Sequence, residues 1–340
     1  MSGGVDSSVA AALLADGGHE VVGATLKLWG GDSDSGCCSV ADVDDARRVA
    51  DQIGIPHHVF NLTADFEQSV VAPYVADHGA GRTPNPCVEC NRSIKFGTLL
   101  DRARRLGFEA LATGHHARVE QVEGRWRLRR GADRHKDQSY VLAMLGQDQL
   151  AATVLPVGSL TKEAVRAEAA RRGLRTAAKP DSQDVCFITR TSGRRAFVGE
   201  RLDLHEGAVV EATTGAVVGS VPAVELVTLG QRRGLGVAVD GRRRYALAVD
   251  VVGRRVVVGG SDEAVCQRVA VGTPTWVDRP LVAGDRALAQ TSAHGEAAPC
   301  RWLGHAVAFE RPHPLVAPGQ TVALYHASYG DAVAGSASAA

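Results

Sequence analysis

Ser2-Gly3-Gly4-Val5-Asp6-Ser7-Ser8 opens the chain and sets the class of fold that follows it. Two adjacent glycines let the backbone turn tightly and approach a ligand closely, and the hydroxyls and the next helix supply donors for an anion. We expect Ser7 or Ser8 to cap that helix, which ends at Gly17-Gly18. No Gly-Lys-Ser/Thr follows, so the stretch predicts a pyrophosphate cradle distinct from the common phosphate loop. The plainer alternative is a Ser/Gly-rich turn before an ordinary helix.

Length and composition bound the class of protein. The chain has 340 residues, enough for two or three domains, and 45% hydrophobic and 22% charged residues are typical of a soluble globular protein. No apolar run is long enough to span a membrane and no signal peptide precedes the loop, so we expect a cytoplasmic protein with no membrane partner. The net charge is zero and does not indicate a nucleic-acid partner.

The distribution of positive charge is more suggestive. Arginines suit phosphate backbones, but they suit any solvated face equally, so these clusters leave RNA binding open. The clusters are Arg102, Arg104 and Arg105; Arg125, Arg127, Arg129 and Arg130; Arg232 and Arg233; and Arg242, Arg243 and Arg244.

Strand-like and helix-like patterns alternate over the first part of the chain, which predicts an α/β domain with a doubly wound parallel sheet. The expected strands are 21–26, 58–62 and 110–114, and the expected helices are 42–53, 64–78, 94–106 and 161–173. Ligands of such sheets bind at the carboxyl ends of the strands, where the first loop and Gly114 would converge. A loop of this kind should follow a strand, yet only Met1 precedes it, so we expect that the first strand is missing or that the start is assigned too late.

Beyond about residue 193, short valine-rich runs alternate with glycine-containing turns, which predicts two small β-rich modules. We therefore expect a catalytic domain at 1–193, a central β-rich module at 194–260 and a C-terminal barrel-like β module at 261–330. The Ala/Ser/Gly-rich tail 331–340 is expected to be disordered.

Seven cysteines in a cytosolic chain argue for reactive or metal-binding thiols rather than structural disulfides. Cys87 and Cys90 follow a stiff Thr-Pro-Asn-Pro stretch, and we expect a helix to begin close behind Cys90. A thiol there, with Arg92 and Lys95 nearby, would be more acidic and more nucleophilic than usual. Cys186 lies far along the chain, in the segment 179–188.

Taken in order, these motifs resemble one family. They are the first loop, Thr83-Pro84-Asn85-Pro86 with Cys90-Asn91, Gly114-His115, His135-Lys136-Asp137-Gln138-Ser139-Tyr140, Asp181-Ser182 with Cys186-Phe187-Ile188, and Leu229-Gly230-Gln231-Arg232-Arg233-Gly234-Leu235-Gly236. The chain is similar, from Ser2 to about Tyr325, to the tRNA-specific 2-thiouridylases of the MnmA/TrmU type, which belong to the ATP pyrophosphatases. The resemblance implies an adenine nucleotide α-hydrolase-like fold, ATP and Mg²⁺ as cofactors, and 2-thiolation of the wobble uridine of tRNA.

That chemistry fits the residue types. Replacing the uracil C2 oxygen by sulfur requires that the oxygen become a leaving group, which adenylation by ATP achieves. It also requires a sulfur nucleophile such as a cysteine persulfide, and a second thiol that cleaves the S–S bond.

The resemblance also implies roles for individual residues. Cys186 would carry the persulfide, supplied by a cysteine desulfurase or a sulfur-relay protein, and Cys90 would attack it and leave a Cys90–Cys186 disulfide. Asn85, Pro86 and Cys87 would line the flipped base at the anticodon. The residues implied in ATP binding are Ser2, Gly3, Gly4, Val5, Asp6, Ser7, Ser8, Leu26 and Gly114, with Asp6 near Mg²⁺. Those implied in tRNA binding are His115, Lys136, Asp137, Gln138 and Gln320.

The chain departs from the family at Cys87, where many members carry Asp. Cys87, Cys90 and Cys186 could instead hold three irons of a [4Fe–4S] cluster whose fourth iron binds sulfide. Zinc lacks an obvious fourth ligand, and a spectator thiol at Cys87 is the simplest alternative. Cys37-Cys38 is a helper pair or a packed loop pair. Two wider alternatives stay open: another ATP pyrophosphatase, such as an amide synthetase or a different tRNA sulfurtransferase, or an inactive, N-truncated sulfur or iron–sulfur carrier.

Overall fold

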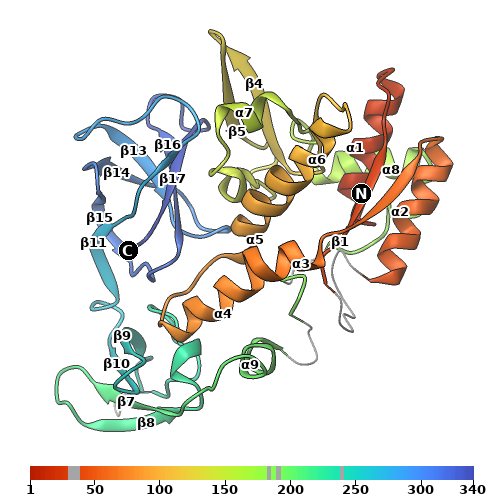
Figure 1. Cartoon of the computed structure of the whole chain (residues 1–340). Helices are drawn as coiled ribbons and strands as arrows, with labels where there is room; N and C mark the ends of the chain where they lie inside the picture. The colour runs from red at the N-terminus through yellow and green to blue at the C-terminus, as the bar shows by residue number, and fades with distance from the viewer. Residues whose placement is uncertain (30–38, 182–184, 189–192, 238–240) are drawn as a thin grey trace.

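The computed structural model describes residues 1–29, 39–181, 185–188, 193–237 and 241–340. In Figure 1 the chain divides into an α/β part, a small β-rich part around β7–β10, and a β-rich part that contains β11–β17. The pair Cys37-Cys38 and residues Ser182 to Asp184 lie outside the described residues.

The α/β part contains the predicted alternation of helices and strands. Its helices are α1 (Val5–Asp16), α2 (Val40–Ile53), α3 (Thr63–Phe66) running through η1 (Glu67–Val71) into α4 (Ala72–Gly79), α5 (Pro86–Glu89) running through η2 (Cys90–Leu99) into α6 (Leu100–Arg105), α7 (Gln147–Ala151), α8 (Lys162–Arg171) and α9 (Gly193–Gly199), with a 3₁₀ turn η3 (Ser139–Leu142). Its parallel strands are β1 (Gly23–Lys27), β2 (His57–Asn61), β3 (Leu111–Ala112) and β6 (Thr153–Val154).

The parallel strands form two pairs within the described residues, β1 with β2 and β3 with β6. The start of the chain lies between them, since Thr25 of β1 donates a 2.7 Å hydrogen bond to the Met1 carbonyl, while Gly114, just after β3, packs against Asp6 and Ser7. Apolar residues of α1, α2 and α8 pack together on one side, including Val9, Val49 and Val165. Another apolar cluster joins α3, η1, α4 and η2 to the end of β1.

The first helix begins earlier than its sequence suggests, so the expected Ser7 or Ser8 cap is wrong. Gly4 is the N-cap residue, no side chain caps this end, and the Ser7 and Ser8 hydroxyls donate back to the Gly4 carbonyl at 3.1 and 2.9 Å. Gly3 explains the early start, because it has φ +69° and a Cβ there would lie 2.4 Å from the Asp42 carbonyl oxygen. Two glycines therefore complete the turn before either serine is reached.

An antiparallel hairpin that was not predicted projects from the α/β part. Strands β4 (Ala117–Val122) and β5 (Arg125–Arg130) pair through a turn at Glu123 and Gly124, which have φ +51° and +76°. Positive φ at both central residues is the geometry that matches the twist of a two-residue hairpin.

The central module is a four-stranded sheet in the order β8-β7-β10-β9, with β7 and β10 parallel. Its strands are β7 (Gly207–Glu211), β8 (Val217–Val221), β9 (Tyr245–Asp250) and β10 (Arg255–Gly259), with a short turn η4 (Val224–Leu226). Its core includes Val209, Val224 and Val256.

The C-terminal module is a seven-stranded sheet in the order β11-β15-β14-β13-β16-β17-β12. Its strands are β11 (Val265–Ala270), β12 (Thr275–Trp276), β13 (Arg286–Gln290), β14 (Ala298–Trp302), β15 (Ala306–Pro314), β16 (Thr321–His326) and β17 (Val333–Ser338). The segment from β11 to β12 bonds to β15 at one end and to β17 at the other, so the two edges meet and the sheet closes into a barrel.

The tail 331–340 is not disordered, so that expectation is wrong. It forms β17, whose residues Val333 to Ala337 are buried and pair with β16. Small residues are what this position requires, because a Cβ on Gly335 would lie 2.4 Å from the Thr275 carbonyl oxygen. The Ala/Ser/Gly composition therefore reflects close packing against β12.

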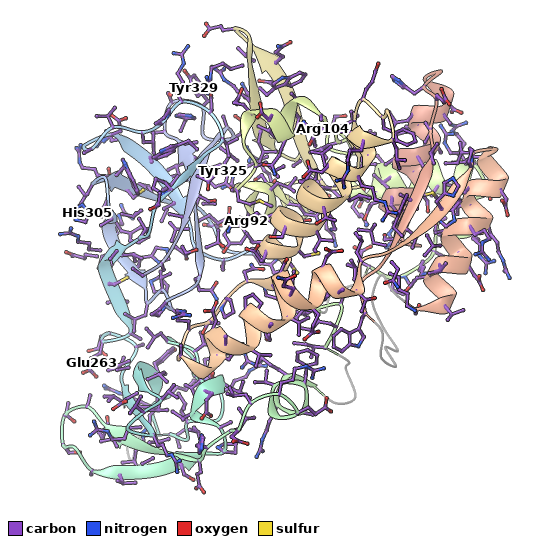
Figure 2. All side chains as sticks on the ribbon, in the orientation of Figure 1. Arg92, Arg104, Glu263, His305, Tyr325 and Tyr329 are labelled. Atoms are coloured by element: carbon purple, nitrogen blue, oxygen red, sulfur yellow. The ribbon has the colours of Figure 1, made fainter. Side chains whose placement is uncertain are left out.

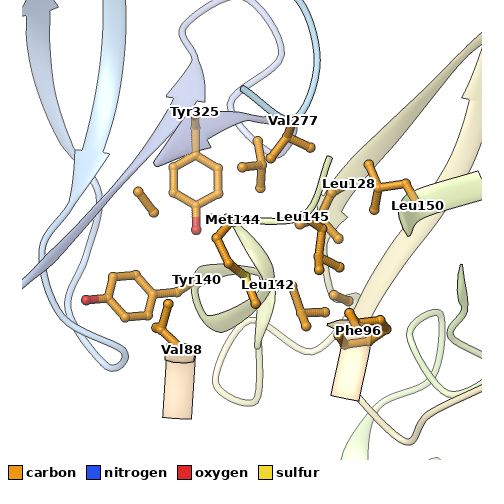
Figure 3. Close-up of a cluster of buried hydrophobic side chains, with 14 residues drawn as sticks. Val88, Phe96, Leu128, Tyr140, Leu142, Met144, Leu145, Leu150, Val277 and Tyr325 are labelled. Atoms are coloured by element: carbon orange, nitrogen blue, oxygen red, sulfur yellow. The ribbon is translucent and has the colours of Figure 1, made fainter. Parts of the chain in front are cut away.

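The barrel and the α/β part share one hydrophobic core. Figure 3 shows Val88, Phe96, Leu128, Tyr140 and Leu142 in the same cluster as Val277 and Tyr325 of the barrel, together with Met144, Leu145 and Leu150. In the part of the chain described here, no helix is long and apolar enough to cross a membrane.

Candidate active site

The N-terminus of α1 is the predicted nucleotide-binding end. Ser2 and Ser7 are tied together, with Ser2 N–H donating to Ser7 Oγ at 3.1 Å. Because no side chain caps this helix, its first amides are available for an anion, and the helix dipole favours negative charge there. Gly114 must lack a side chain, since a Cβ would lie 2.6 Å from the Ser7 nitrogen. The backbone of this end therefore has room and free amides for a phosphate group, and phosphate binding here stays a prediction.

An ionic network connects this loop to the segment that carries Cys186. Lys162 Nζ lies 2.8 Å from both carboxylate oxygens of Asp6 and 2.8 Å from Asp181 Oδ1. Asp181 also pairs with Lys136 and Arg166, each at 2.8 Å. Burial alone would raise the pKa of Asp181, but the hydrogen bonds from Lys136 and Lys162 outweigh it and lower the pKa to about 2.

The Asp6 carboxylate is held in its charged form by the same kind of contact. Burial would raise its pKa, yet His116 Nε2 at 3.1 Å and Lys162 lower it overall. A carboxylate at the mouth of a phosphate site is a suitable ligand for Mg²⁺, which takes one or two carboxylates together with substrate phosphates. Asp6 is thus the side chain of the first loop that best fits the predicted metal role.

His115 and His116 differ from the sequence-based expectation. His115 is buried, bonds to Thr113 Oγ1 at 2.7 Å and lies beside the Phe96 ring, and burial holds its pKa well below the usual value. His116, to which no role was assigned, is the histidine that contacts Asp6. In this structure, His115 therefore packs inside the domain.

The helix that follows the Pro-Asn-Pro stretch begins before both cysteines, not behind Cys90 as expected. Asn85 caps α5, and its Oδ1 accepts from the Cys87 and Val88 amides at 3.1 and 3.3 Å. Cys87 lies in the first turn and is exposed, while Cys90 lies one turn further and is buried. One helical turn thus separates an accessible thiol from a thiol inside the domain.

Cys90 and Cys186 pack against the same apolar cluster although they are far apart in sequence. Cys90 belongs to the apolar cluster that contains Phe66, Ile94 and Phe187, and Cys186 packs against the same cluster. Cys90 is buried there, which excludes water from its sulfur atom, while Cys186 is partly buried.

The three cysteines do not form a metal site in the part of the chain that is described. Over those residues, no group of three His, Cys, Asp or Glu side chains is arranged to hold a metal ion. Cys87 is exposed, Cys90 is buried and Cys186 is partly buried, so the three thiols do not share one environment. The described residues do not form the ligand set that a [4Fe–4S] cluster requires.

The Thr83–Cys87 stretch lies where the three parts of the chain meet. The Thr83 amide donates to the Pro318 carbonyl at 2.7 Å, and its hydroxyl lies 3.2 Å from Thr228 of the central module. Gln320, predicted to contact tRNA, donates its side-chain amide to the Thr83 carbonyl at 2.8 Å. Leu26 lies in β1 opposite Phe60 and is partly buried.

The remaining residues predicted to bind tRNA lie in the 135–140 motif, which turns between the α/β part and the barrel. Asp137 accepts from the Gly131 and Ser139 amides and pairs with Arg130 at 3.2 Å. Gln138 accepts from the His116 amide at 2.9 Å. Lys136 is partly exposed but is paired with Asp181.

The arginine cluster of the hairpin contacts protein carboxylates. Arg125 and Arg127 lie 3.2 and 3.0 Å from Asp278, whose side chain is 2% exposed, and Arg129 lies 2.8 Å from Asp331. Arg130 stacks over the Tyr325 ring at 3.9 Å. These arginines therefore join the hairpin to the barrel, and their charge is used within the protein.

An uncapped helix end after a Gly-Gly turn, on parallel strands, defines a nucleotide-binding protein of the HUP class. The family model described as "tRNA methyl transferase HUP domain" matches residues 1–190, and "tRNA methyl transferase PRC-barrel domain" matches residues 195–260. Curated relatives give the more particular assignment. This chain is 45% identical over 354 residues to "tRNA-specific 2-thiouridylase MnmA" of Mycobacterium tuberculosis, covering 100% of this chain and 95% of that protein.

Two further relatives carry the same name. The protein of Thermobifida fusca is 44% identical, covering 100% of this chain and 94% of its own, and that of Roseiflexus sp. is 44% identical, covering 98% and 96%. The chain belongs to the tRNA-specific 2-thiouridylase family. A solved structure of NMN synthetase from Francisella tularensis is 17% identical with a TM-score of 0.33, over 53% of this chain and 63% of that one, which is too distant to bear on function.

Proposed function

We propose that this protein uses ATP to convert the wobble uridine of tRNA to 2-thiouridine, with release of AMP and pyrophosphate. The observation that carries the proposal is the placement of two distant thiols, Cys90 and Cys186, against one apolar cluster. The segment before Cys186 is tied through Asp181 and Lys162 to Asp6 of the nucleotide loop. Sulfur chemistry and nucleotide chemistry are thereby joined in one site. The names of the curated relatives support tRNA as the substrate.

In this scheme the phosphates of ATP lie over the first amides of α1, and Asp6 would hold a Mg²⁺ ion that neutralises phosphate charge. Leu26 and Gly114 also contact ATP. The uracil C2 oxygen attacks the α-phosphorus and the α–β phosphate bond breaks, which releases pyrophosphate and leaves C2 bonded to a good leaving group. Lys162 lies where it can meet negative charge that develops on the phosphates.

Sulfur transfer then uses the two thiols. The terminal sulfur of a Cys186 persulfide attacks C2 and displaces AMP, which leaves the base bonded to Cys186 through two sulfur atoms. The Cys90 thiolate attacks the Cys186 sulfur, and the S–S electron pair leaves with the base as the 2-thiocarbonyl. The Cys90–Cys186 disulfide is reopened by a thiol reductant, and a cysteine desulfurase or a relay protein restores the persulfide. ATP, tRNA and such donors are available together in the cytoplasm.

The direct test is to supply the purified protein with ATP, unmodified tRNA and a cysteine desulfurase with cysteine, and to measure 2-thiouridine by nucleoside mass spectrometry. Cys186→Ser and Cys90→Ser should each abolish the product. Cys266→Ser is the matched control, because this thiol lies in the barrel with a pKa raised by burial, and it should keep full activity. Product formation by Cys186→Ser would refute the assignment.

A Cys87 variant distinguishes the persulfide mechanism from the [4Fe–4S] mechanism. We expect Cys87→Ser to keep most of the activity, because the exposed thiol takes no part in a Cys90–Cys186 exchange. Anaerobic purification with iron and sulfide analysis gives the second measurement. Activity that requires about four irons per chain, and is lost in Cys87→Ser, would replace the persulfide scheme by a [4Fe–4S] scheme. ATP consumption without thiouridine would instead indicate a different ATP pyrophosphatase.

A further inference from the structure

Gln320 belongs to a turn of the barrel that is fixed independently of any RNA. The Gly319 amide donates to the Ala339 carbonyl at 2.9 Å, and the Ala339 amide donates to the Gln320 carbonyl at 2.8 Å. Gly319 has φ +85°, which favours glycine, and the site of its missing Cβ lies 3.4 Å from the Thr83 backbone. The end of the chain therefore holds this turn in place against the segment that precedes Cys87.

The turn and Thr83 form a two-sided backbone contact. The Thr83 amide donates to Pro318, and the Thr83 carbonyl accepts from Gln320 Nε2, so one residue of the turn binds each polar group of Thr83. A third contact lies beside them: the Tyr140 hydroxyl donates to the Thr321 carbonyl at 2.9 Å. Asn85 also bonds to this hydroxyl, and Asn85 caps α5 ahead of Cys87.

We infer that Gln320 is a positioning residue: from the barrel, it fixes the Thr83–Cys87 stretch and thereby the start of the helix that carries Cys87 and Cys90. Its side-chain amide is committed to the Thr83 carbonyl in the RNA-free protein. The barrel then contributes to the reaction by presenting a rigid Asn85–Cys87 surface to the base, without touching the base. The contact between Gln320 and Thr83 does not depend on the proposed function. Only the purpose of the positioning, which is to present the stretch to the base, rests on that proposal.

The contact itself is testable without RNA or activity. Gln320→Glu keeps the size and shape of the side chain but removes the donor to Thr83. Gln267→Ala is the matched control, since Gln267 is an exposed glutamine of the same barrel, on β11. Hydrogen–deuterium exchange of peptides covering residues 79–90 should be at least fivefold faster in Gln320→Glu and unchanged in Gln267→Ala. Peptides of the barrel core serve as the internal measure that the module remains folded.

Steady-state thiolation gives the second measurement. If Gln320 positions the stretch, Gln320→Ala lowers kcat about tenfold while KM for tRNA stays within twofold of the wild-type value. An RNA contact would give the opposite split, with a raised KM and little change in kcat. Unchanged exchange in peptides 79–90 overturns the inference whatever the kinetics show. If the protein forms no 2-thiouridine at all, the proposed function fails, and the exchange experiment still decides the role of Gln320.

Discussion

Lys162 contacts two carboxylates that come from opposite ends of the α/β domain, Asp6 in the first loop and Asp181 ahead of Cys186. Its side chain is 11% exposed, so the ammonium group is largely removed from water and depends on these partners. The sequence predicted the helix on which Lys162 lies but gave no sign of this role. A side chain that meets a residue more than a hundred positions away leaves no local pattern, because the contact depends on how two elements pack.

His115 and His116 also show that a side-chain contact cannot be predicted from the local sequence. The motif Gly114-His115 pointed to His115, whereas His116 is the neighbour that reaches Asp6. Both histidines are buried, so which of them reaches Asp6 depends on how the segment packs and not on a local pattern. In the N-terminal loop, the tight turn was predicted from its glycines, and Gly3 has a positive φ, but the predicted serine cap was wrong.

Replacing Lys162 by methionine should make stability depend less on pH. Asp6 and Asp181 have lowered pKa values in the folded protein, so their pairing stabilises it fully above the unfolded value of 3.8. The stabilisation is lost as the pH falls through the folded pKa values, of which that of Asp181 is about 2. We expect Lys162→Met to lower the free energy of unfolding by about 1 kcal/mol at pH 7, since partial exposure screens the pairs. The difference in the free energy of unfolding between Lys162→Met and wild type should become smaller between pH 5 and pH 3. Urea unfolding at several pH values measures this difference.

Arg105→Met is the control for that experiment, because Arg105 is exposed on α6, away from both carboxylates. It should change the free energy of unfolding by less than about 0.5 kcal/mol at every pH. A gap between Lys162→Met and wild type that stayed constant from pH 7 to pH 3 would contradict the assigned ion pairs.

At the scale of elements, the β4–β5 hairpin is the main feature that was not predicted. Alternate residues of a strand share a face, so Arg125, Arg127 and Arg129 all point to the same side, and barrel-module carboxylates lie there. The sequence did carry the signal, a Glu-Gly turn between two alternating runs. The cluster counted along the chain left phosphate contacts open, whereas the strand period shows a face that contacts Asp278 and Asp331.

Asp278→Asn tests that face. Asp278 is almost fully buried and pairs with Arg125 and with Arg127, whose side chain is 11% exposed, so losing its charge leaves a guanidinium without its counter-ion. We expect a loss of about 3 kcal/mol and a melting temperature lower by several degrees. Glu310→Gln is the matched control: its 3.5 Å pair with Arg286 is exposed and should contribute less than about 1 kcal/mol. Equal effects of the two variants would count against the hairpin contact.

The last strand gives a second test at this scale. Gly335→Ala places a methyl group against the Thr275 carbonyl and Trp276, which are backbone and ring atoms that cannot move aside cheaply. We expect it to destabilise the protein by about 2 kcal/mol. Gly219→Ala in β8, with no atom within 4 Å of the new methyl group, is the control and should be neutral. A neutral Gly335→Ala would fit a disordered tail rather than β17.

At the scale of the whole molecule, the order of an α/β part followed by β-rich parts was predictable from sequence texture, because strand and helix periods are local properties. How these parts pack against one another was not predictable from the sequence. The cluster that joins Val88 and Leu142 to Val277 and Tyr325 brings together residues that are far apart along the chain, each of which is an ordinary core residue of its own element. The barrel is thereby part of the structure that holds the candidate site, and the arginine and Gln320 contacts add to the same interface.

Tyr325 tests whether the α/β part and the barrel unfold as one unit. Its ring, labelled in Figures 2 and 3, is fully buried. Its hydroxyl bonds to Ser139 and Gln290 at 3.1 and 2.9 Å. Burial raises the pKa of Tyr325 to about 12, so the hydroxyl stays protonated. Tyr325→Ala should cost about 4 kcal/mol through the cavity it leaves, and Tyr325→Phe about 1 kcal/mol through the lost hydrogen bonds.

The measurement is differential scanning calorimetry combined with near-ultraviolet and far-ultraviolet circular dichroism. Because the core is shared, we expect the helical signal of the α/β part and the aromatic signal of the barrel tryptophans to move together to lower temperature in Tyr325→Ala. Tyr325→Phe, which keeps the ring, should shift both signals by a smaller, equal amount. A helical transition that kept its wild-type midpoint while the barrel melted early would show two independent units, and a barrel that unfolds alone could not serve as the fixed support for the Thr83–Cys87 stretch.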